Sequence, residues 1–253
     1  MSGICQGSDT RRLSLTPVRF YILSNCNMHI HLLSIFPDSF TSRLQTSLIS
    51  KAQSRQIITF HTIDPRDFCD DRGQYVDDEI YGGGAGMLLK AKPFIDAVNS
   101  LLPIIKDTAW KVVYLTPSPL MRNQSLAYEY AALDHLIIIS GRYEGIDERM
   151  CQYLADHYDD HFVKISLGEY ILLGGEAAAM VVVESIVRLI PWVIKESASH
   201  LIESYDPSKS QPTIEYPHYT RPDEVYGYTI PPVLKSGHHL HIQQRRDDHT
   251  QRL

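Results

Sequence analysis

Cysteine is scarce in this sequence, and the few cysteines that it has are far apart. No two of them stand in the C-x-x-C spacing that zinc ribbons and redox motifs use. A disulfide framework is typical of small secreted domains, and this chain of 253 residues shows no such pattern. We therefore expect reduced thiols and a cytoplasmic protein, with single cysteines at Cys5, Cys26, Cys69 and Cys151.

The sequence also lacks a long hydrophobic run. The longest one, Ala177 to Val183, is closed by Glu184, whereas a membrane-spanning helix needs about 20 apolar residues. The first 27 residues hold only short apolar clusters, without the stretch of about 7–15 apolar residues that a secretory signal requires. We expect no membrane span, and we interpret residues 1–27 as a non-core N-terminal extension.

An excess of positive charge is absent as well. The chain carries 24 lysines and arginines against 30 aspartates and glutamates, which gives a formal net charge of −6. A protein that coats nucleic acid without specificity needs a basic surface, so this balance counts against that role. A local basic patch stays compatible with the composition.

The sequence does contain a regular alternation of short apolar runs with segments of helix length. Runs rich in β-branched residues, such as "LIIIS", that alternate with helical segments are typical of a mostly parallel sheet covered by helices. We therefore predict an α/β fold. The expected strands are His29–Ile35, Ile57–Ile63, Lys111–Thr116, His135–Ser140 and Phe162–Ser166. The expected helices are Phe40–Ala52, Lys92–Leu102, Gln124–Leu133, Ile146–Ala155 and Gly175–Ile190.

The composition changes after the last helix of this series. That helix is apolar almost all round and should be buried. The segment from Lys195 to Pro212 is polar and rich in serine, which indicates a linker. A further helix is expected from about Gly237 to the end. The predicted organisation is a sheet domain over residues 28–194, a linker over 195–212 and a small helical domain over 213–253.

Three glycine-rich turns stand where strands should end: "YGGGAGM", "SGRYEGIDER" and "LGEYILLGGE". In open α/β sheets, ligands bind beyond the carboxyl ends of strands. None of the three is a P-loop or a dinucleotide-binding G-x-G-x-x-G turn. The third turn suits a flat, partly apolar group such as an adenine, because backbone groups can read its edge while Tyr170, Ile171 and Leu172 cover its faces. Taken alone, a glycine pair before a helix is more often an ordinary turn, because glycine tolerates backbone angles that other residues cannot adopt.

The second turn, "SGRYEGIDER", packs charged side chains around two glycines directly after a buried strand. A surface turn with mutual ion pairs is one interpretation, since such pairs are common. The other is a polar substrate site, because the cluster lies at the carboxyl end of a strand. The charged residues are Arg142, Glu144, Asp147, Glu148 and Arg149.

Histidines invite a metal hypothesis in two places. His238, His239 and His241 are near neighbours, and His29 and His31 alternate on a strand. A structural zinc site needs about four ligands at suitable spacing, and no cysteine stands near the C-terminal group. We expect no metal site there and interpret these side chains as a solvated helix face.

The three turns together with "FPDSF", "RDF" and "EYPHYTRP" form a much more specific pattern than any one of them. With this set the chain closely resembles the bacterial tRNA (guanine-N1)-methyltransferase of the SPOUT class, from Met28 to about His241. The resemblance implies a deep C-terminal trefoil knot in the sheet domain, a feature that ordinary fold rules would never predict. It also implies S-adenosyl-L-methionine as cofactor, with magnesium as a candidate second cofactor.

The resemblance assigns the cofactor pocket to the loops of the knot. Arg142 and Glu144 would lie near the methionine end of the cofactor and the target base. The residues that the resemblance implies for cofactor binding are Tyr114, Leu115, Thr116, Pro117, Gly141, Tyr143, Glu144, Leu167, Gly168, Glu169, Tyr170, Ile171, Leu172, Gly174 and Gly175.

The family supplies its general base from an aspartate in a "D-S-F" context after the buried helix. Here the matching stretch reads Ile202-Glu203-Ser204-Tyr205, so Glu203 keeps the carboxylate with one more methylene, and Asp206 is its rival. A carboxylate on the N1–H of guanine can take the proton, and a guanidinium near O6 can stabilise the developing charge. The arginine role falls on Arg188, whose alternative is an i, i+4 pair with Glu184.

The resemblance predicts methyl transfer from S-adenosyl-L-methionine to N1 of the guanosine at tRNA position 37, beside the anticodon. It also implies tRNA and a second copy of the chain, in a homodimer, as partners. Two alternatives stay open: a knotted RNA methyltransferase with another target nucleoside, and a non-catalytic purine-nucleotide-binding module.

Overall fold

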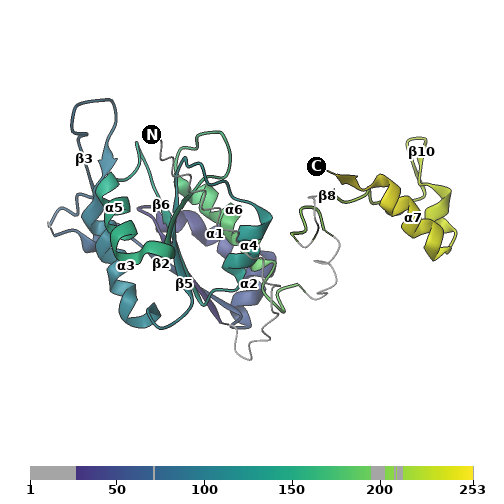
Figure 1. Cartoon of the computed structure of the whole chain (residues 1–253), viewed down its shortest axis with the longest axis horizontal. Helices are drawn as coiled ribbons and strands as arrows, with labels where there is room; N and C mark the ends of the chain where they lie inside the picture. The colour runs from purple at the N-terminus through teal and green to yellow at the C-terminus, as the bar shows by residue number, and fades with distance from the viewer. Residues whose placement is uncertain (1–26, 71, 195–202, 208, 210–212, 253) are drawn as a thin grey trace, which may run out of the picture.

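A parallel sheet of five strands forms the centre of the protein (Figure 1). The structure is a computed structural model, and it describes residues 27–70, 72–194, 203–207, 209 and 213–252. The strand order is β2-β1-β6-β5-β7, and each neighbouring pair is parallel. This confirms the predicted mostly parallel sheet, with bounds within two residues of those expected. The strands are β1 Met28–Leu33, β2 Ile58–Ile63, β5 Trp110–Leu115, β6 His135–Ser140 and β7 Phe162–Ile165.

Helices cover both faces of this sheet, as Figure 1 shows. Side chains alternate between the faces along each strand, so Ile30 and Leu32 join one core cluster while Leu33 joins the other. The first cluster includes α2 (Ser47–Ser54) and α6 (Gly175–Val187), and α4 (Gln124–Ala131) packs against α6. The second lies under α3 (Ala91–Ile105) and α5 (Glu148–Tyr158). The predicted burial of α6 is confirmed, since nine of its 13 residues are buried.

The first predicted helix is wrong in one respect, because it is broken in two. In place of one helix over Phe40–Ala52, the chain forms a 3₁₀ turn, Pro37–Phe40, then α1 (Thr41–Leu44) and α2. Thr46 is extended, its hydroxyl donates to Ser42 O at 2.6 Å, and Ser47 has a φ of 53°. Hydroxyl side chains compete with the helix for backbone hydrogen bonds, which explains the break in this serine- and threonine-rich stretch.

The helices of the described part of the chain are short. Within the part of the chain that the structure describes, no helix has the length and apolar character that crossing a membrane requires.

The start of α5 differs from the prediction. The helix begins at Glu148 and not at the expected Ile146, because Asp147 caps it by accepting a hydrogen bond from Arg149 N.

The "YGGGAGM" turn connects two very short antiparallel strands, β3 (Asp77–Asp78) and β4 (Leu88–Leu89). Its glycines take positive φ angles, and Tyr81 at its start is 96% exposed. The turn therefore projects from the end of this two-stranded hairpin.

The C-terminal residues fold around α7 (His239–His249), which Figure 1 draws apart from the sheet. The predicted helix to the end of the chain is wrong at its last turn: it ends at His249, and β11 (Gln251–Arg252) then pairs with β8 (Thr213–Ile214). Two further short strands, β9 (Glu224–Val225) and β10 (Tyr228–Thr229), form a hairpin, and a 3₁₀ turn follows at Pro232–Lys235.

Four histidines from three strands gather on the α3 and α5 face of the sheet. His29 Nδ1 lies 3.0 Å from His61 Nε2, and His31 Nε2 lies 3.2 Å from His135 Nδ1. The rings are stacked, with centroids 4.7 Å apart for His31 and His61 and 4.8 Å apart for His29 and His135. His31 is only 5% exposed, and burial, with the three neighbouring imidazoles, lowers its pKa to about 3. We call these four residues the histidine cluster.

Two of the predicted segments fall largely outside the described residues. These are the N-terminal extension, of which only Asn27 is described, and the linker, of which only 203–207 and 209 are. The proposed domain boundaries therefore stay predictions.

Candidate functional site

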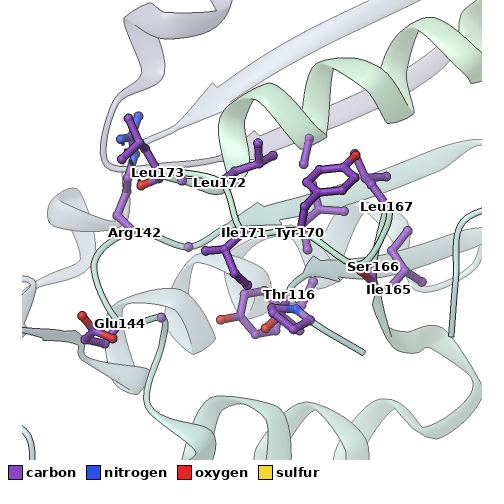
Figure 2. A pocket seen from close by; sticks show the side chains of 18 of the residues that line it. Thr116, Arg142, Glu144, Ile165, Ser166, Leu167, Tyr170, Ile171, Leu172 and Leu173 are labelled. Carbon is purple, nitrogen blue, oxygen red and sulfur yellow. Dashed lines mark hydrogen bonds between the residues drawn. The ribbon is translucent and has the colours of Figure 1, made fainter. Parts of the chain in front are cut away.

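A cavity opens at the carboxyl ends of three adjacent strands, β6, β5 and β7 (Figure 2). Its volume is about 390 Å³, within the range of small-molecule sites. Of the fifteen residues predicted for cofactor binding, fourteen line it, and Glu169 does not. The lining also includes Arg142, which was expected near the methionine end of the cofactor, and five residues that the prediction omitted: Gly145, Ile165, Ser166, Leu173 and Ala178.

Close packing of two backbones explains the glycine that begins α6. Gly175 N donates to Gly141 O at 2.9 Å, and a Cβ at Gly175 would lie 2.7 Å from Ser140 Cα. Backbone atoms cannot yield to such a contact, so only glycine fits. The end of β6 and the start of α6 therefore form one wall of the cavity.

A buried ion pair fixes the same wall. Arg142 Nε lies 2.8 Å from Glu176 Oε2, and Ser34 Oγ donates to Glu176 Oε1 at 2.6 Å. Glu176 is only 5% exposed, and the Arg142 guanidinium stacks 4.7 Å from the Phe36 ring. The ends of β1 and β6 and the start of α6 are thus connected through one carboxylate.

The first two glycine-rich turns lie against each other. Glu144 N donates to Met87 O, and Leu89 N donates to Gly145 O. Each of the two interpretations of "SGRYEGIDER" describes one part of the turn. Arg142 and Glu144 line the cavity, as a substrate site would require, whereas Asp147 forms an ion pair with Arg149, as in a surface turn. That hydrogen bond from Arg149 lowers the pKa of the Asp147 carboxyl.

The predicted base and its arginine lie in direct contact. Arg188, directly after α6, donates from Nη1 to Glu203 Oε2 at 2.7 Å and from Nη2 to Glu203 Oε1. This two-point hydrogen bond raises the pKa of Arg188. The alternative pair of Arg188 with Glu184 is wrong, since Glu184 instead accepts from Arg43 Nη1 at 3.0 Å.

A tyrosine of α4 lies close to this pair. Burial raises the pKa of Tyr128, and the negative charges of Glu203 and Asp206 raise it further. Both carboxylates therefore raise the pKa of the same phenol, and either of them remains a candidate for the general base.

The cavity and the Arg188–Glu203 pair lie at opposite ends of α6. The helix begins at Gly175 on the cavity wall and ends just before Arg188. Its 13 residues extend about 20 Å at 1.5 Å per residue. Within one copy of the chain, the carboxylate therefore stands well away from the cavity.

Metal-binding clusters are absent from the described part of the chain: no group of three or more His, Cys, Asp or Glu side chains there has the arrangement to hold an ion. The histidine cluster is included in that finding. Two pairs of its ring nitrogens lie within hydrogen-bond distance of each other, His29 with His61 and His31 with His135.

The comparison with known families covers every element described above. Residues 28–253 match the family described as tRNA (guanine-1)-methyltransferase TrmD. The chain belongs to this family. The resemblance inferred from the glycine-rich turns and "EYPHYTRP" is thereby confirmed.

Individual members of the tRNA (guanine-1)-methyltransferase family are similar over most of their length. The chain is 43% identical to the tRNA (guanine-N(1)-)-methyltransferase of Carboxydothermus hydrogenoformans over 215 residues, which are 85% of this chain and 79% of that protein. Its counterpart from Synechocystis is 40% identical over 87% of this chain and 89% of its own length. The one from Chloroflexus aggregans is 43% identical over 89% and 84%.

Sequence reasoning found the parts of the tRNA (guanine-1)-methyltransferase site that glycine-rich turns mark. It missed residues that reach the cavity from regular elements, such as Ile165 at the end of β7 and Ala178 one turn into α6. The periodicity of α6 was the available signal, since Ala178 lies on the same helix face as Gly175.

Proposed function

We propose that this protein transfers the methyl group of S-adenosyl-L-methionine to N1 of the guanosine at tRNA position 37. The observation that carries the proposal is membership of the tRNA (guanine-1)-methyltransferase family across residues 28–253. Two features of this chain support it: a cavity that fits the cofactor, and a carboxylate–guanidinium pair suited to activating guanine.

The cavity fits an adenosyl cofactor in size and in lining. Glycines at 141, 168, 174 and 175 leave backbone groups accessible, while Tyr170, Ile171 and Leu172 present apolar surface. Figure 2 shows Tyr170 and Ile171 extending over the cavity from the same loop, with Thr116 opposite. When bound there, the sulfonium supplies an already activated methyl group, so the protein has only to orient the reactants and remove one proton.

Guanine N1 carries a hydrogen at neutral pH and becomes a good nucleophile only when that proton leaves. Glu203 is the proposed acceptor, and the two-point contact with the Arg188 guanidinium holds its carboxylate in place. As the proton leaves, negative charge develops on O6, where Arg188 can donate a hydrogen bond. The base must leave its stack to reach both groups, which costs little in an anticodon loop.

A homodimer would bring the two halves of the site together. The Arg188–Glu203 pair lies at the far end of α6 from the cavity, so a two-fold related copy is the simplest source of the missing half. Two apolar side chains of the cavity lining are highly exposed in a single chain, as a surface for a second copy would be: Ile171 at 81% and Leu173 at 94%.

Mixed dimers test this arrangement. One protomer carries Thr116→Trp, which places a bulky ring in the cavity, and the other carries Glu203→Gln. If the site spans two copies, one of the two sites in each mixed dimer is intact, and turnover should be about half that of the parent. Each variant alone should be inactive. Mixed dimers as inactive as the single variants, or a fully active monomer in sedimentation, would contradict the shared site.

The wider architecture follows the family. We propose a trefoil knot in the sheet domain, as membership of the family implies. We also propose that residues 28–194 bind the cofactor, that 195–212 link the domains, and that 213–253 contact tRNA in the cytoplasm. Magnesium stays a candidate second cofactor, and Glu169 a candidate cofactor contact outside the cavity lining.

Transfer of a tritiated methyl group to tRNA transcripts tests the activity directly. Two transcripts would differ only at the nucleotide that follows the anticodon, guanosine in one and adenosine in the other. We expect label only in the guanosine transcript. Label at another nucleoside would favour a different knotted RNA methyltransferase, and cofactor binding without transfer to any tRNA would favour a non-catalytic module.

A further inference from the structure

The turn after α6 holds a large aromatic side chain in an unfavourable backbone conformation. Trp192 has a φ of 72°, in the left-handed region that bulky residues rarely adopt. Its ring is nevertheless 72% exposed, so burial of the indole does not offset the strain. Strain of this kind persists where neighbouring contacts impose it, and it gathers at functional sites.

The surrounding contacts fix this conformation. Ile190 and Val193 on either side are buried, at 3% and 7% exposure, and Val193 N donates to Ile190 O at 3.3 Å. Arg55, which directly follows α2, donates from Nη1 to Trp192 O at 2.7 Å. The turn is therefore anchored on both sides while the indole points outward.

The position of Trp192 places it beside the proposed reaction site. It follows Arg188 by four residues, which separates the two by no more than about 14 Å even along an extended backbone. Two cations stand at the end of α2 that contacts this turn. Arg55, just after the helix, donates to the Trp192 carbonyl, and the exposed Lys51 lies one helical turn before Arg55.

We propose that Trp192 is a stacking platform for an unpaired nucleobase of the tRNA next to the reacting guanosine, with Lys51 and Arg55 near its phosphates. This inference rests on the proposed function. An exposed indole offers a flat apolar face on which any base stacks, and adjacent cations neutralise the backbone. The combination suits an anticodon loop, whose bases are unpaired and whose target base has to leave its stack.

Three substitutions distinguish the effect of the indole ring from the effect of the strained backbone. Trp192→Gly removes the ring and relieves the left-handed strain, Trp192→Ala removes the ring alone, and Trp192→Phe keeps a stacking surface. We expect the Gly and Ala variants to raise the Kd for tRNA by roughly 10-fold to 100-fold, as loss of one stacked base does. Trp192→Phe should stay near the parent, and the Kd for S-adenosyl-L-methionine should not change in any of them.

Fluorescence gives a direct readout, because the chain has only two tryptophans and Trp110 is buried. Binding of tRNA should quench the emission of the parent and leave that of Trp192→Phe nearly unchanged. Lys51→Ala should lower the slope of log Kd against log salt by about 0.7, the value for one phosphate contact on a single strand. Ile104→Ala, at an exposed apolar residue on the other face of the sheet, serves as the control.

A Trp192→Gly variant with a higher melting temperature and an unchanged Kd for tRNA would overturn the proposal. Dissociation of the Gly variant into monomers in sedimentation would also overturn it, because the indole would then belong to an interface between copies. Both outcomes differ from failure of the proposed function itself, in which the parent protein would transfer no methyl group to any tRNA.

Discussion

Replacing Glu203 with glutamine should lower turnover in methyl transfer by about 100-fold or more, the contribution typical of a general base. Glutamine keeps the shape and can still contact Arg188, but its amide cannot accept the N1 proton. The affinity for S-adenosyl-L-methionine should stay unchanged, because Glu203 is not among the residues that line the cavity. Single-turnover kinetics and calorimetric titration measure the two effects separately.

Two matched variants make this experiment decisive. Asp206→Asn removes the rival carboxylate and should have a mild effect, since Glu203 is the carboxylate in contact with Arg188. Glu203→Asp restores the residue of the family and should keep substantial activity. An inactive Asp206→Asn variant beside an active Glu203→Gln variant would place the base three residues downstream.

Acid should destabilise the protein through His31. Its pKa is lowered to about 3 in the folded state, against 6.5 when unperturbed, so below pH 6.5 the unfolded chain binds a proton that the folded chain refuses. The free energy of unfolding is therefore unaffected by His31 above pH 6.5, and it decreases as the pH falls below that value. One proton contributes about 1.4 kcal/mol per pH unit, which amounts to about 3 kcal/mol by pH 4.5. Burial also lowers the pKa of His61 and His135, which acts in the same direction.

A variant without the titrating group isolates this effect from that of the carboxylates. His31→Leu should lose about 3 kcal/mol less than the parent between pH 7 and pH 4.5. The free energy of unfolding would be measured in urea at each pH, with the emission of Trp110 in β5 as the probe. His239→Leu, at an exposed position on α7, should follow the parent. Parallel curves for His31→Leu and the parent would rule out the histidine cluster as the source.

The strands could be predicted because each is a short run of apolar and β-branched residues between polar segments. β6 shows this most clearly, since its six residues are all buried and read "HLIIIS". The strand order could not be predicted in the same way. Nothing local in His29, His31, His61 or His135 indicates that β1 lies between β2 and β6, and this order is what brings the four rings together.

The candidate site also has parts that could be predicted from the sequence and parts that could not. Glycine-rich turns indicated the cavity because their backbone requirements leave a mark on the sequence. The ion pair of Arg142 with Glu176 could not be derived, because it depends on how the turn after β6 meets the start of α6. The role of Arg188 came from the family resemblance, whereas its local neighbour Glu184 suggested the wrong partner. Side-chain pairing across distant elements is a property of the packed structure.

β1 is an inner strand of the sheet, and it lies between a strand made shortly after it, β2, and one made much later, β6. β2 ends at Ile63 and β6 begins at His135, so a ribosome that adds about 5–20 residues per second needs roughly 4–14 s to supply the second neighbour. Helix α6, which covers this face of the sheet, is synthesised later still. Until then the side chains of Ile30 and Leu32 cannot be fully buried, because they pack in the same core cluster as α6. We expect the nascent chain to depend on ribosome-associated chaperones for longer than a protein whose strands pair in order of synthesis.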